Sequence, residues 1–247
     1  MTSTLSPPLS PPPPPSESVP LQTSIECVLF DLDGTLIDTA PDFIKVVQRL
    51  LAENDKPPLS PTSIRQRVSD GARALVKLAF GIEEQDSQFD SLNQRLLELY
   101  YEQLEDTEAS LYPGLDEFLQ KLEASEIPWG IVTNKPEKYT VRLLQKLNLL
   151  DRCKTLICPE QVTNRKPHPE PILLACERLG CDTERTVYFG DHIRDIQAAK
   201  NADVIAIAVA YGYISEDTKV EDWYADFILQ SADQAEGLLN LLKFADR

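Results

Sequence analysis

The chain of 247 residues, 42% of them hydrophobic, is long enough to fold as one large domain or as a core with a smaller insert. Forty acidic residues against 24 basic ones give a formal net charge of −16. Because nucleic acids and anionic membranes repel such a chain, neither is an expected partner, and an anionic substrate must be drawn in by a local cation.

The first 24 residues contain eight prolines, five of them consecutive at positions 11–15, and no Lys or Arg. This segment lacks the basic start and the apolar stretch of a secretory signal, and its composition predicts a disordered proline-rich tail over residues 1–24. No apolar run approaches the ~18 residues of a membrane-spanning helix, so we expect a cytoplasmic protein. The five cysteines include no C-x-x-C pair, which favours reduced thiols over a disulfide framework or a zinc site.

From residue 25 onward, short apolar runs rich in β-branched residues alternate with amphipathic helical patterns. We expect strands at 25–30, 129–132, 155–158, 187–189, 204–209 and 227–229, with helices such as 139–147 and 171–179 between them. Strands that alternate with helices predict an α/β fold with a doubly wound parallel sheet. Substrates of such sheets bind beyond the carboxyl ends of the strands.

Residues 41–110 interrupt this alternation. They show helical patterns at 43–52, 64–80 and 91–104 and no convincing strand. Because about 70 residues are far too many for an ordinary loop, we expect a small helical domain inserted after the first strand. The sheet core would then comprise residues 25–40 and 111–247, and the helical insert would overhang the edge of the sheet.

The first predicted strand ends in the sequence F-D-L-D-G, which places Asp31 and Asp33 at the edge of the sheet. D-x-D-G favours a sharp turn and also begins a calcium-binding loop. A calcium loop needs further oxygen ligands and a Glu that completes twelve residues. Apolar residues follow here instead, and we expect a helix to begin at Asp38. The pattern therefore does not indicate calcium.

Three later segments end or follow predicted strands and carry polar side chains. Thr133 closes the strand at 129–132, Lys166 lies in the proline-braced turn R-K-P-H-P, and Asp191 and Asp195 follow the strand at 187–189. Since the carboxyl ends of parallel strands share one edge, these side chains are expected to converge on Asp31.

The expected group contains three acids, Asp31, Asp191 and Asp195, with Asp33 nearby, and adds one lysine and one hydroxyl. This combination fits phosphate chemistry. Mg²⁺ prefers hard oxygen ligands and is commonly held by one or two carboxylates, which makes Asp31, Asp33, Asp191 and Asp195 the candidate ligands. Asp31 and Asp191 are the expected direct ligands, with Asp195 behind them. Lys166 would neutralise the nucleophile and the phosphate.

Each remaining role follows from charge and position. Asp31 is the expected nucleophile, because carboxylates are competent in phosphoryl transfer. Asp33 is the expected general acid and base, protonating the leaving oxygen and then deprotonating the attacking water. Thr133 would donate a hydrogen bond to a phosphoryl oxygen, whose negative charge is spread in the transition state.

D-L-D-G-T, the strand-end Thr133, K-P-H-P and G-D-x-x-x-D together resemble the four signatures of the haloacid-dehalogenase superfamily, in order, over about residues 25–231. The resemblance implies a Rossmann-like core with an α-helical cap whose closure excludes water. Phosphatases and phosphomutases of the superfamily carry an acid two residues after the nucleophile, as Asp33 does here. The resemblance thus implies magnesium-dependent hydrolysis of a phosphomonoester. A sugar phosphomutase, or a non-catalytic binding protein of the same fold, remains open.

A finer resemblance, to phosphoglycolate phosphatases, is carried by residues 38–42, 69–75, 112–114, 132–136 and 211–213. Residues 157–162 and 213–226 are most similar to the N-acetylmuramic acid 6-phosphate phosphatases within that group. The resemblance implies a small phosphate ester that bears a carboxylate. N-acetylmuramic acid 6-phosphate, from peptidoglycan recycling, is the first expectation and 2-phosphoglycolate the second.

The candidate substrate-binding residues are Gly71, Arg73 and Asn134. Gly71 and Arg73 belong to the predicted cap, and Arg73 is the candidate for the substrate carboxylate, although a solvated helix arginine fits the pattern as well. Asn134 follows Thr133. The next residue, Lys135, is expected at the surface, with a contribution to phosphate binding as the alternative. The oligomeric state stays open between monomer and homodimer.

Overall fold

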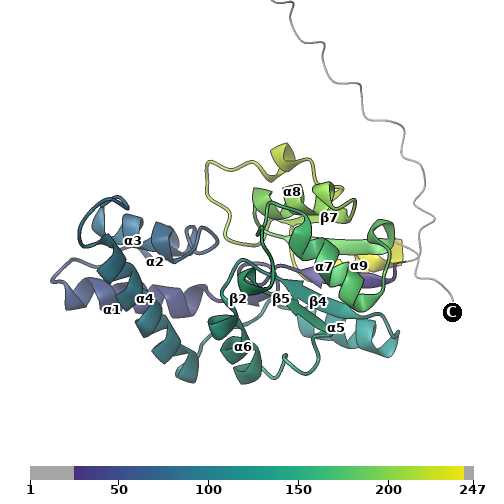
Figure 1. The fold of residues 1–247 in the computed structure, drawn as a ribbon, viewed down its shortest axis with the longest axis horizontal. Coiled ribbons are helices and arrows are strands. Elements are labelled where there is room, and N and C mark those ends of the chain that lie inside the picture. The colour runs from purple at the N-terminus through teal and green to yellow at the C-terminus, as the bar shows by residue number, and fades with distance from the viewer. Residues whose placement is uncertain (1–24, 242–247) are drawn as a thin grey trace, which may run out of the picture.

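The structure is a computed structural model that describes residues 25–241 (Figure 1). The predicted tail over residues 1–24 lies outside the described residues. A six-stranded sheet has the order β5-β4-β1-β6-β7-β8, and every neighbouring pair is parallel. Its strands are β1 (Cys27–Phe30), β4 (Trp129–Val132), β5 (Thr155–Ile157), β6 (Thr186–Gly190), β7 (Ile205–Val209) and β8 (Phe227–Leu229). The predicted α/β fold with a doubly wound parallel sheet is confirmed.

Helices cover both faces of this sheet. The core on one face includes side chains of α5 (Leu115–Ala124), α6 (Glu137–Lys146) and α9 (Gln234–Leu241), and the core on the other includes side chains of α7 (Glu170–Leu179) and α8 (Ile193–Asn201). Strands buried on both faces are apolar throughout, which is why the sequence shows continuous rather than alternating hydrophobic runs. All four residues of β1 and β4 are buried.

The central strand β1 lies at the point where the winding reverses. From β1 the chain reaches β4 and then β5 on one side, and it crosses back to β6, β7 and β8 on the other. The carboxyl ends of β4 and β6 therefore flank the carboxyl end of β1, where ligands of doubly wound sheets bind.

Four helices between β2 and β3 lie beside the sheet rather than on its faces (Figure 1). They are α1 (Ala40–Glu53), α2 (Pro61–Arg65), α3 (Ala72–Phe80) and α4 (Phe89–Gln103). The predicted continuous helix over 64–80 is wrong, because the chain leaves the helix after α2 and re-enters it at α3. Gly71 precedes α3 with a φ of +87°, a left-handed conformation that no helix contains. Apolar residues keep a helical spacing on both sides of Gly71, so the sequence pattern does not reveal the interruption between α2 and α3.

Two short strands join this helical group to the sheet. β2 (Ile37–Asp38) pairs antiparallel with β3 (Ser110–Leu111), so the segments that enter and leave the helices lie side by side. The helix expected from Asp38 begins instead at Ala40, and β3 lies at the end of a segment predicted to hold no strand. A two-residue strand has no detectable period, and its partner is distant in the chain.

Single 3₁₀ turns complete the described elements: η1 (Leu104–Asp106), η2 (Pro159–Gln161), η3 (Thr183–Arg185) and η4 (Val220–Trp223). All five cysteines lie in the described part of the chain, and each is a free thiol. Over residues 25–241, the helices are all too short or too polar to cross a bilayer.

Candidate active site

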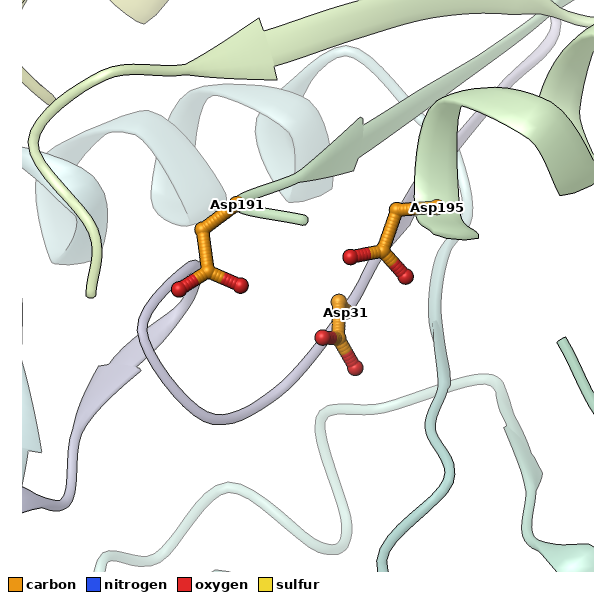
Figure 2. Close-up of side chains that lie close together, drawn as sticks. All are labelled: Asp31, Asp191 and Asp195. Carbon is orange, nitrogen blue, oxygen red and sulfur yellow. The ribbon is translucent and has the colours of Figure 1, made fainter. Parts of the chain in front are cut away.

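Three buried carboxylates from separate segments gather at the carboxyl edge of the sheet (Figure 2). Asp31 follows β1, Asp191 follows β6, and Asp195 lies in the first turn of α8. One oxygen from each side chain lies within 4.8 Å of the other two. Asp191 and Asp195 are almost wholly buried, and Asp31 is 9% exposed.

Lys166 supplies the positive charge at this group. Its Nζ lies 2.8 Å from Asp31 Oδ1 and 2.7 Å from Asp195 Oδ1, and it donates to the Val132 carbonyl and the Tyr188 hydroxyl. Burial alone would lower the pKa of the ammonium, but the charges of Asp195 and Asp31 outweigh it and raise the pKa of Lys166. The single positive charge of Lys166 therefore offsets only part of the negative charge that three ionised carboxylates would carry.

The two strand-end acids hold their protons more tightly than ordinary carboxylic acids do. Burial is the main cause of the raised pKa of Asp31, the charge of Asp195 adds to it, and Lys166 opposes it. For Asp191, burial and the charges of Asp31 and Asp195 raise the pKa well above its usual range. This excess of buried negative charge favours a cation between these acids.

Asp191 provides a test of whether a metal ion fits. Its Oδ2 accepts hydrogen bonds from the Tyr213 amide (2.9 Å) and the Ser69 hydroxyl (2.8 Å), whereas its Oδ1 is buried and has no hydrogen-bond donor among the described residues. A buried carboxylate oxygen with no donor is costly. Hard carboxylate oxygens with a missing partner suit Mg²⁺, so the residues present fit the ion that the sequence predicts.

The turn after β1 makes room for this arrangement. Gly34 has a φ of +81°, and a Cβ built on it would lie 2.0 Å from Asp191 Oδ2. Only glycine therefore fits both the backbone conformation and the space. The G of the D-x-D-G pattern lets the chain after β1 approach Asp191 at the end of β6.

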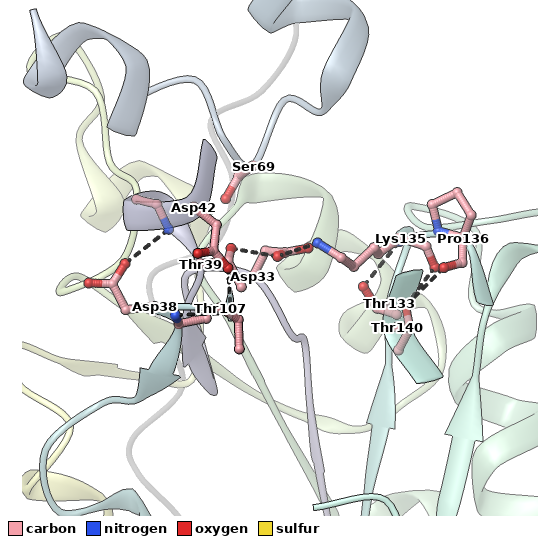
Figure 3. Close-up of polar contacts among 12 residues, drawn as sticks. Asp33, Asp38, Thr39, Asp42, Ser69, Thr107, Thr133, Lys135, Pro136 and Thr140 are labelled. Carbon is pink, nitrogen blue, oxygen red and sulfur yellow. Dashed lines mark hydrogen bonds and ion pairs between the residues drawn. The ribbon is translucent and has the colours of Figure 1, made fainter. Parts of the chain in front are cut away.

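Asp33 does not join the three-carboxylate group. Its Oδ1 accepts hydrogen bonds from the Thr39 hydroxyl at 2.6 Å and from Lys135 Nζ at 2.9 Å (Figure 3). The carboxylate lines the same cleft as Asp31, as a group that exchanges protons there would have to. The structure thus separates Asp33 from the other acidic candidates.

The expectation that Lys135 is at the surface is wrong. The side chain is 6% exposed, pairs with Asp33, and places its Nζ 4.4 Å from the ring centroid of Tyr100 and 4.9 Å from that of Phe43. These rings belong to α4 and α1. No local pattern could reveal the burial, because the covering residues come from the distant helical group.

Thr133 and Asn134 lie beside the nucleophile candidate. Thr133 is 4% exposed, and its Oγ1 accepts from the Lys135 amide, which leaves its hydroxyl proton free to donate. Asn134 Nδ2 donates to the Lys166 carbonyl at 3.0 Å, and its Oδ1 is buried with no hydrogen-bond partner in the part of the chain that the structure describes. Asn134 therefore braces the backbone of Lys166.

A cleft of about 560 Å³ opens above Asp31, between the sheet edge and the helical group. Its lining includes every candidate named from the sequence except Asp191: Asp31, Asp33, Thr133, Asn134, Lys166, Asp195, Gly71 and Arg73. The Arg73 guanidinium donates to Glu84 at 2.9 Å and lies over the Phe89 ring. The volume is in the range of sites for small organic ligands.

Sequence reasoning missed several residues that shape the site. Ser69 bonds to Asp191, and the neighbouring Asp70 lies 3.4 Å from His192 Nε2 and 3.5 Å from Arg194 NH2. The pKa of Asp70 is lowered, chiefly by its hydrogen bond with His192. The sequence signals here were the turn composition S-D-G and the family resemblance of residues 69–75, and neither predicts a contact of Ser69 with the acids of the sheet.

Comparison with known proteins agrees with this geometry. The family model of haloacid dehalogenase-like hydrolases matches residues 28–209. The chain is 40% identical over 218 residues to the N-acetylmuramic acid 6-phosphate phosphatase of Pseudomonas aeruginosa, covering 88% of this chain and 95% of that protein. It is 39% identical to a phosphoglycolate phosphatase of Xanthomonas campestris pv. campestris, covering 84% and 93%. A crystal structure described as a predicted phosphoglycolate phosphatase from Haemophilus somnus superposes with a TM-score of 0.78 at 24% identity, covering 88% and 99%, which supports the fold.

Proposed function

Because the chain belongs to the haloacid dehalogenase-like hydrolases and is a phosphoric monoester hydrolase, we propose that it uses Mg²⁺ and passes through a phospho-enzyme on Asp31. One observation carries the proposal. Asp31 lies in the cleft in contact with the buried Lys166, beside two further buried acids that have too little positive charge around them. The helical group over residues 41–110 acts as the cap of this site.

In the first step an oxygen of Asp31 attacks phosphorus, and the bond from phosphorus to the leaving oxygen breaks. Protonated Asp33 gives its proton to that oxygen, so the product leaves as an alcohol. Lys166 neutralises Asp31, and the Thr133 hydroxyl donates to a phosphoryl oxygen. Bound magnesium, held by Asp31 and Asp191 with Asp195 behind, would supply the positive charge that lets a phosphate dianion approach a carboxylate.

In the second step the Asp33 carboxylate takes a proton from water, and the resulting hydroxide oxygen bonds to phosphorus. The acyl-phosphate bond breaks, which regenerates the Asp31 carboxylate and releases inorganic phosphate. Asp33 ends the cycle protonated, ready for the next ester. The hydrogen bonds from Thr39 and Lys135 keep its carboxylate beside the cleft throughout.

The preferred substrate in this proposal is N-acetylmuramic acid 6-phosphate, with a cytoplasmic role in peptidoglycan recycling. The Pseudomonas aeruginosa relative that carries this name supports it. The cleft of about 560 Å³ also has apolar lining from Phe43, Val68 and Leu97, which suits a sugar ring better than a two-carbon acid. 2-Phosphoglycolate is the second candidate, supported by the Xanthomonas relative.

Turnover of p-nitrophenyl phosphate, with Mg²⁺ and with EDTA, tests the reaction. We expect hydrolysis only with the metal, and a phospho-enzyme that can be trapped in the wild type but not in Asp31→Asn. Stoichiometric release of phosphate from N-acetylmuramic acid 6-phosphate would separate hydrolysis from isomerisation. An isomerised sugar phosphate would indicate a mutase, and the absence of any metal-dependent turnover would indicate a binding protein.

A further inference from the structure

We propose that Arg165 binds the carboxylate of the substrate and thereby selects phosphomonoesters that carry a second anionic group. The inference rests on the proposed function and names the substrate class of that site. It assigns this task to a residue of the sheet core that the sequence did not single out, rather than to Arg73 of the helical group.

The argument begins with the charges along the cleft. Five Lys and Arg side chains line it, and four of them already have carboxylate partners. The pairs are Arg73 with Glu84, Lys135 with Asp33, Lys166 with Asp31 and Asp195, and Arg194 with Asp70. The side chain of Arg165 is exposed and has neither an ion pair nor a hydrogen bond within residues 25–241. Among the five Lys and Arg side chains that line the cleft, this guanidinium is therefore the one without a partner in the described part of the chain, and so the one available to a ligand.

The backbone of Arg165 is held in place although its side chain is free. Glu170 accepts hydrogen bonds from the amides of Thr163 (2.6 Å) and Asn164 (2.9 Å), and the Arg165 carbonyl accepts one from the His168 amide (3.0 Å). Asn134 fixes the next residue, Lys166, through its carbonyl. A fixed main chain reduces the entropy lost when the side chain orders on a ligand.

The position of Arg165 also separates its task from that of its neighbour. Lys166 contacts Asp31, so the phosphate lies at the Lys166 end of the cleft. Arg165 then offers its planar fork to a group farther along the substrate. A guanidinium matches a carboxylate through two parallel hydrogen bonds, which a compact ammonium cannot provide.

Arg73 is less suited to this task. Its guanidinium donates to Glu84 at 2.9 Å and lies 3.6 Å from Asp90. Its guanidinium carbon also lies 4.7 Å from the centroid of the Phe89 ring, in a cation–π contact. A substrate carboxylate would have to compete with these partners, whereas at Arg165 it breaks no side-chain ion pair or hydrogen bond seen within residues 25–241.

Two matched pairs of substrates isolate the carboxylate. N-acetylmuramic acid 6-phosphate differs from N-acetylglucosamine 6-phosphate by its lactyl acid, and 2-phosphoglycolate differs from ethyl phosphate by its acid group. For Arg165→Gln we expect kcat/KM to fall about 10- to 100-fold, mainly through KM, on the acidic member of the pair that the enzyme uses. For the member without the acid, kcat/KM should change by less than about twofold in the same variant, since no charged hydrogen bond is lost. The pair that shows the effect identifies the source of the carboxylate.

Two further variants control the result. Arg165→Lys keeps the charge without the fork and should recover only part of the loss. Arg178→Gln removes the same charge outside the cleft, where the guanidinium bonds to Gln161, and should leave both pairs unchanged.

The assignment is overturned if Arg165→Gln lowers both members of a pair equally, because the residue would then serve the phosphate or the fold. It is also overturned if Arg73→Gln, and not Arg165→Gln, removes the preference for the acid. A wild-type enzyme that hydrolyses none of the four esters with Mg²⁺ would defeat the proposed function, and this assignment with it. Failure of the proposed function therefore shows as an inactive wild type, whereas failure of this assignment alone shows in the variants while the wild type remains active.

Discussion

The acids at the end of β1 occupy different environments although only one residue separates them. Asp31 contacts the buried Lys166 and belongs to the three-carboxylate group, whereas Asp33 accepts hydrogen bonds from Thr39 and Lys135. Different environments allow two carboxyl groups to perform different chemistry, one as a nucleophile and one as an acid and base.

Replacing Asp33 by Asn keeps the shape of the side chain and removes its ability to exchange a proton. We expect kcat to fall by about 10²–10⁴-fold, the usual contribution of general acid–base catalysis. Phospho-enzyme should accumulate when the ester has a good leaving group such as p-nitrophenolate, because the hydrolysis step loses its base. Rapid-quench kinetics would measure both quantities, and a near-normal rate would remove Asp33 from the mechanism.

Asp191 gives a pH-dependent prediction. Because its pKa is raised in the folded protein, the protonated form stabilises the fold. This contribution is complete below the unfolded pKa of about 4 and is lost as the pH rises through the folded pKa. With EDTA present, the free energy of unfolding of the wild type minus that of Asp191→Asn should fall as the pH is raised from about 4 to about 8.

Chemical denaturation at several pH values measures this difference. Asp222→Asn, at an exposed position, controls for the change in net charge. A difference that rises with pH would mean that the Asp191 carboxylate is stabilised in the fold without a metal ion.

At the scale of elements, the turn after β1 determines whether the strand ends can converge. Gly34 combines a left-handed φ with a close approach to Asp191, whereas Gly180, which ends α7, has a left-handed φ of +66° and open space around it. Substitutions at these two glycines therefore separate the free-energy cost of a left-handed backbone conformation from the free-energy cost of steric crowding.

We expect Gly180→Ala to destabilise the fold by about 1 kcal/mol and to leave activity intact, because only backbone strain is added. Gly34→Ala should cost more stability and lower kcat/KM by about 10²-fold, because the new methyl group displaces an active-site carboxylate. Denaturant unfolding and p-nitrophenyl phosphate turnover measure the two effects. Equal losses in the two variants would contradict the role given to this turn.

At the scale of the whole molecule, a net charge of −16 opposes the approach of an anionic substrate. The cations that line the cleft act locally, and all but Arg165 are already paired within residues 25–241. Long-range repulsion between the negatively charged protein and the anionic substrate should therefore control the rate at which the two associate.

Raising the ionic strength from about 20 to about 200 mM at constant free Mg²⁺ should increase kcat/KM by about twofold, because salt screens that repulsion. The increase should be larger for an ester that bears an additional carboxylate than for p-nitrophenyl phosphate. Steady-state kinetics in potassium chloride would show this. A decrease with salt would mean that the cations of the cleft dominate the approach.

Much of this protein can be predicted from local patterns in its chain. The apolar runs alternating with helices gave the parallel sheet, because strands buried on both faces carry a continuous hydrophobic signal. Four motifs at or after strand ends indicated the family, and of the residues they named Asp31, Asp33, Thr133, Lys166 and Asp195 line the cleft, since parallel strands end at one edge.

Only the tertiary structure decided which polar groups meet. The contacts of Lys135 with Phe43 and Tyr100 and the hydrogen bond from Ser69 to Asp191 join segments far apart in the chain. That Arg165 has no side-chain partner within residues 25–241 is likewise visible only in the folded protein. Local periodicity reports which face of an element is buried, and it contains no information about which distant side chain lies against that face. Charge pairing depends on distances through space, and these are determined only when the helical group packs against the sheet.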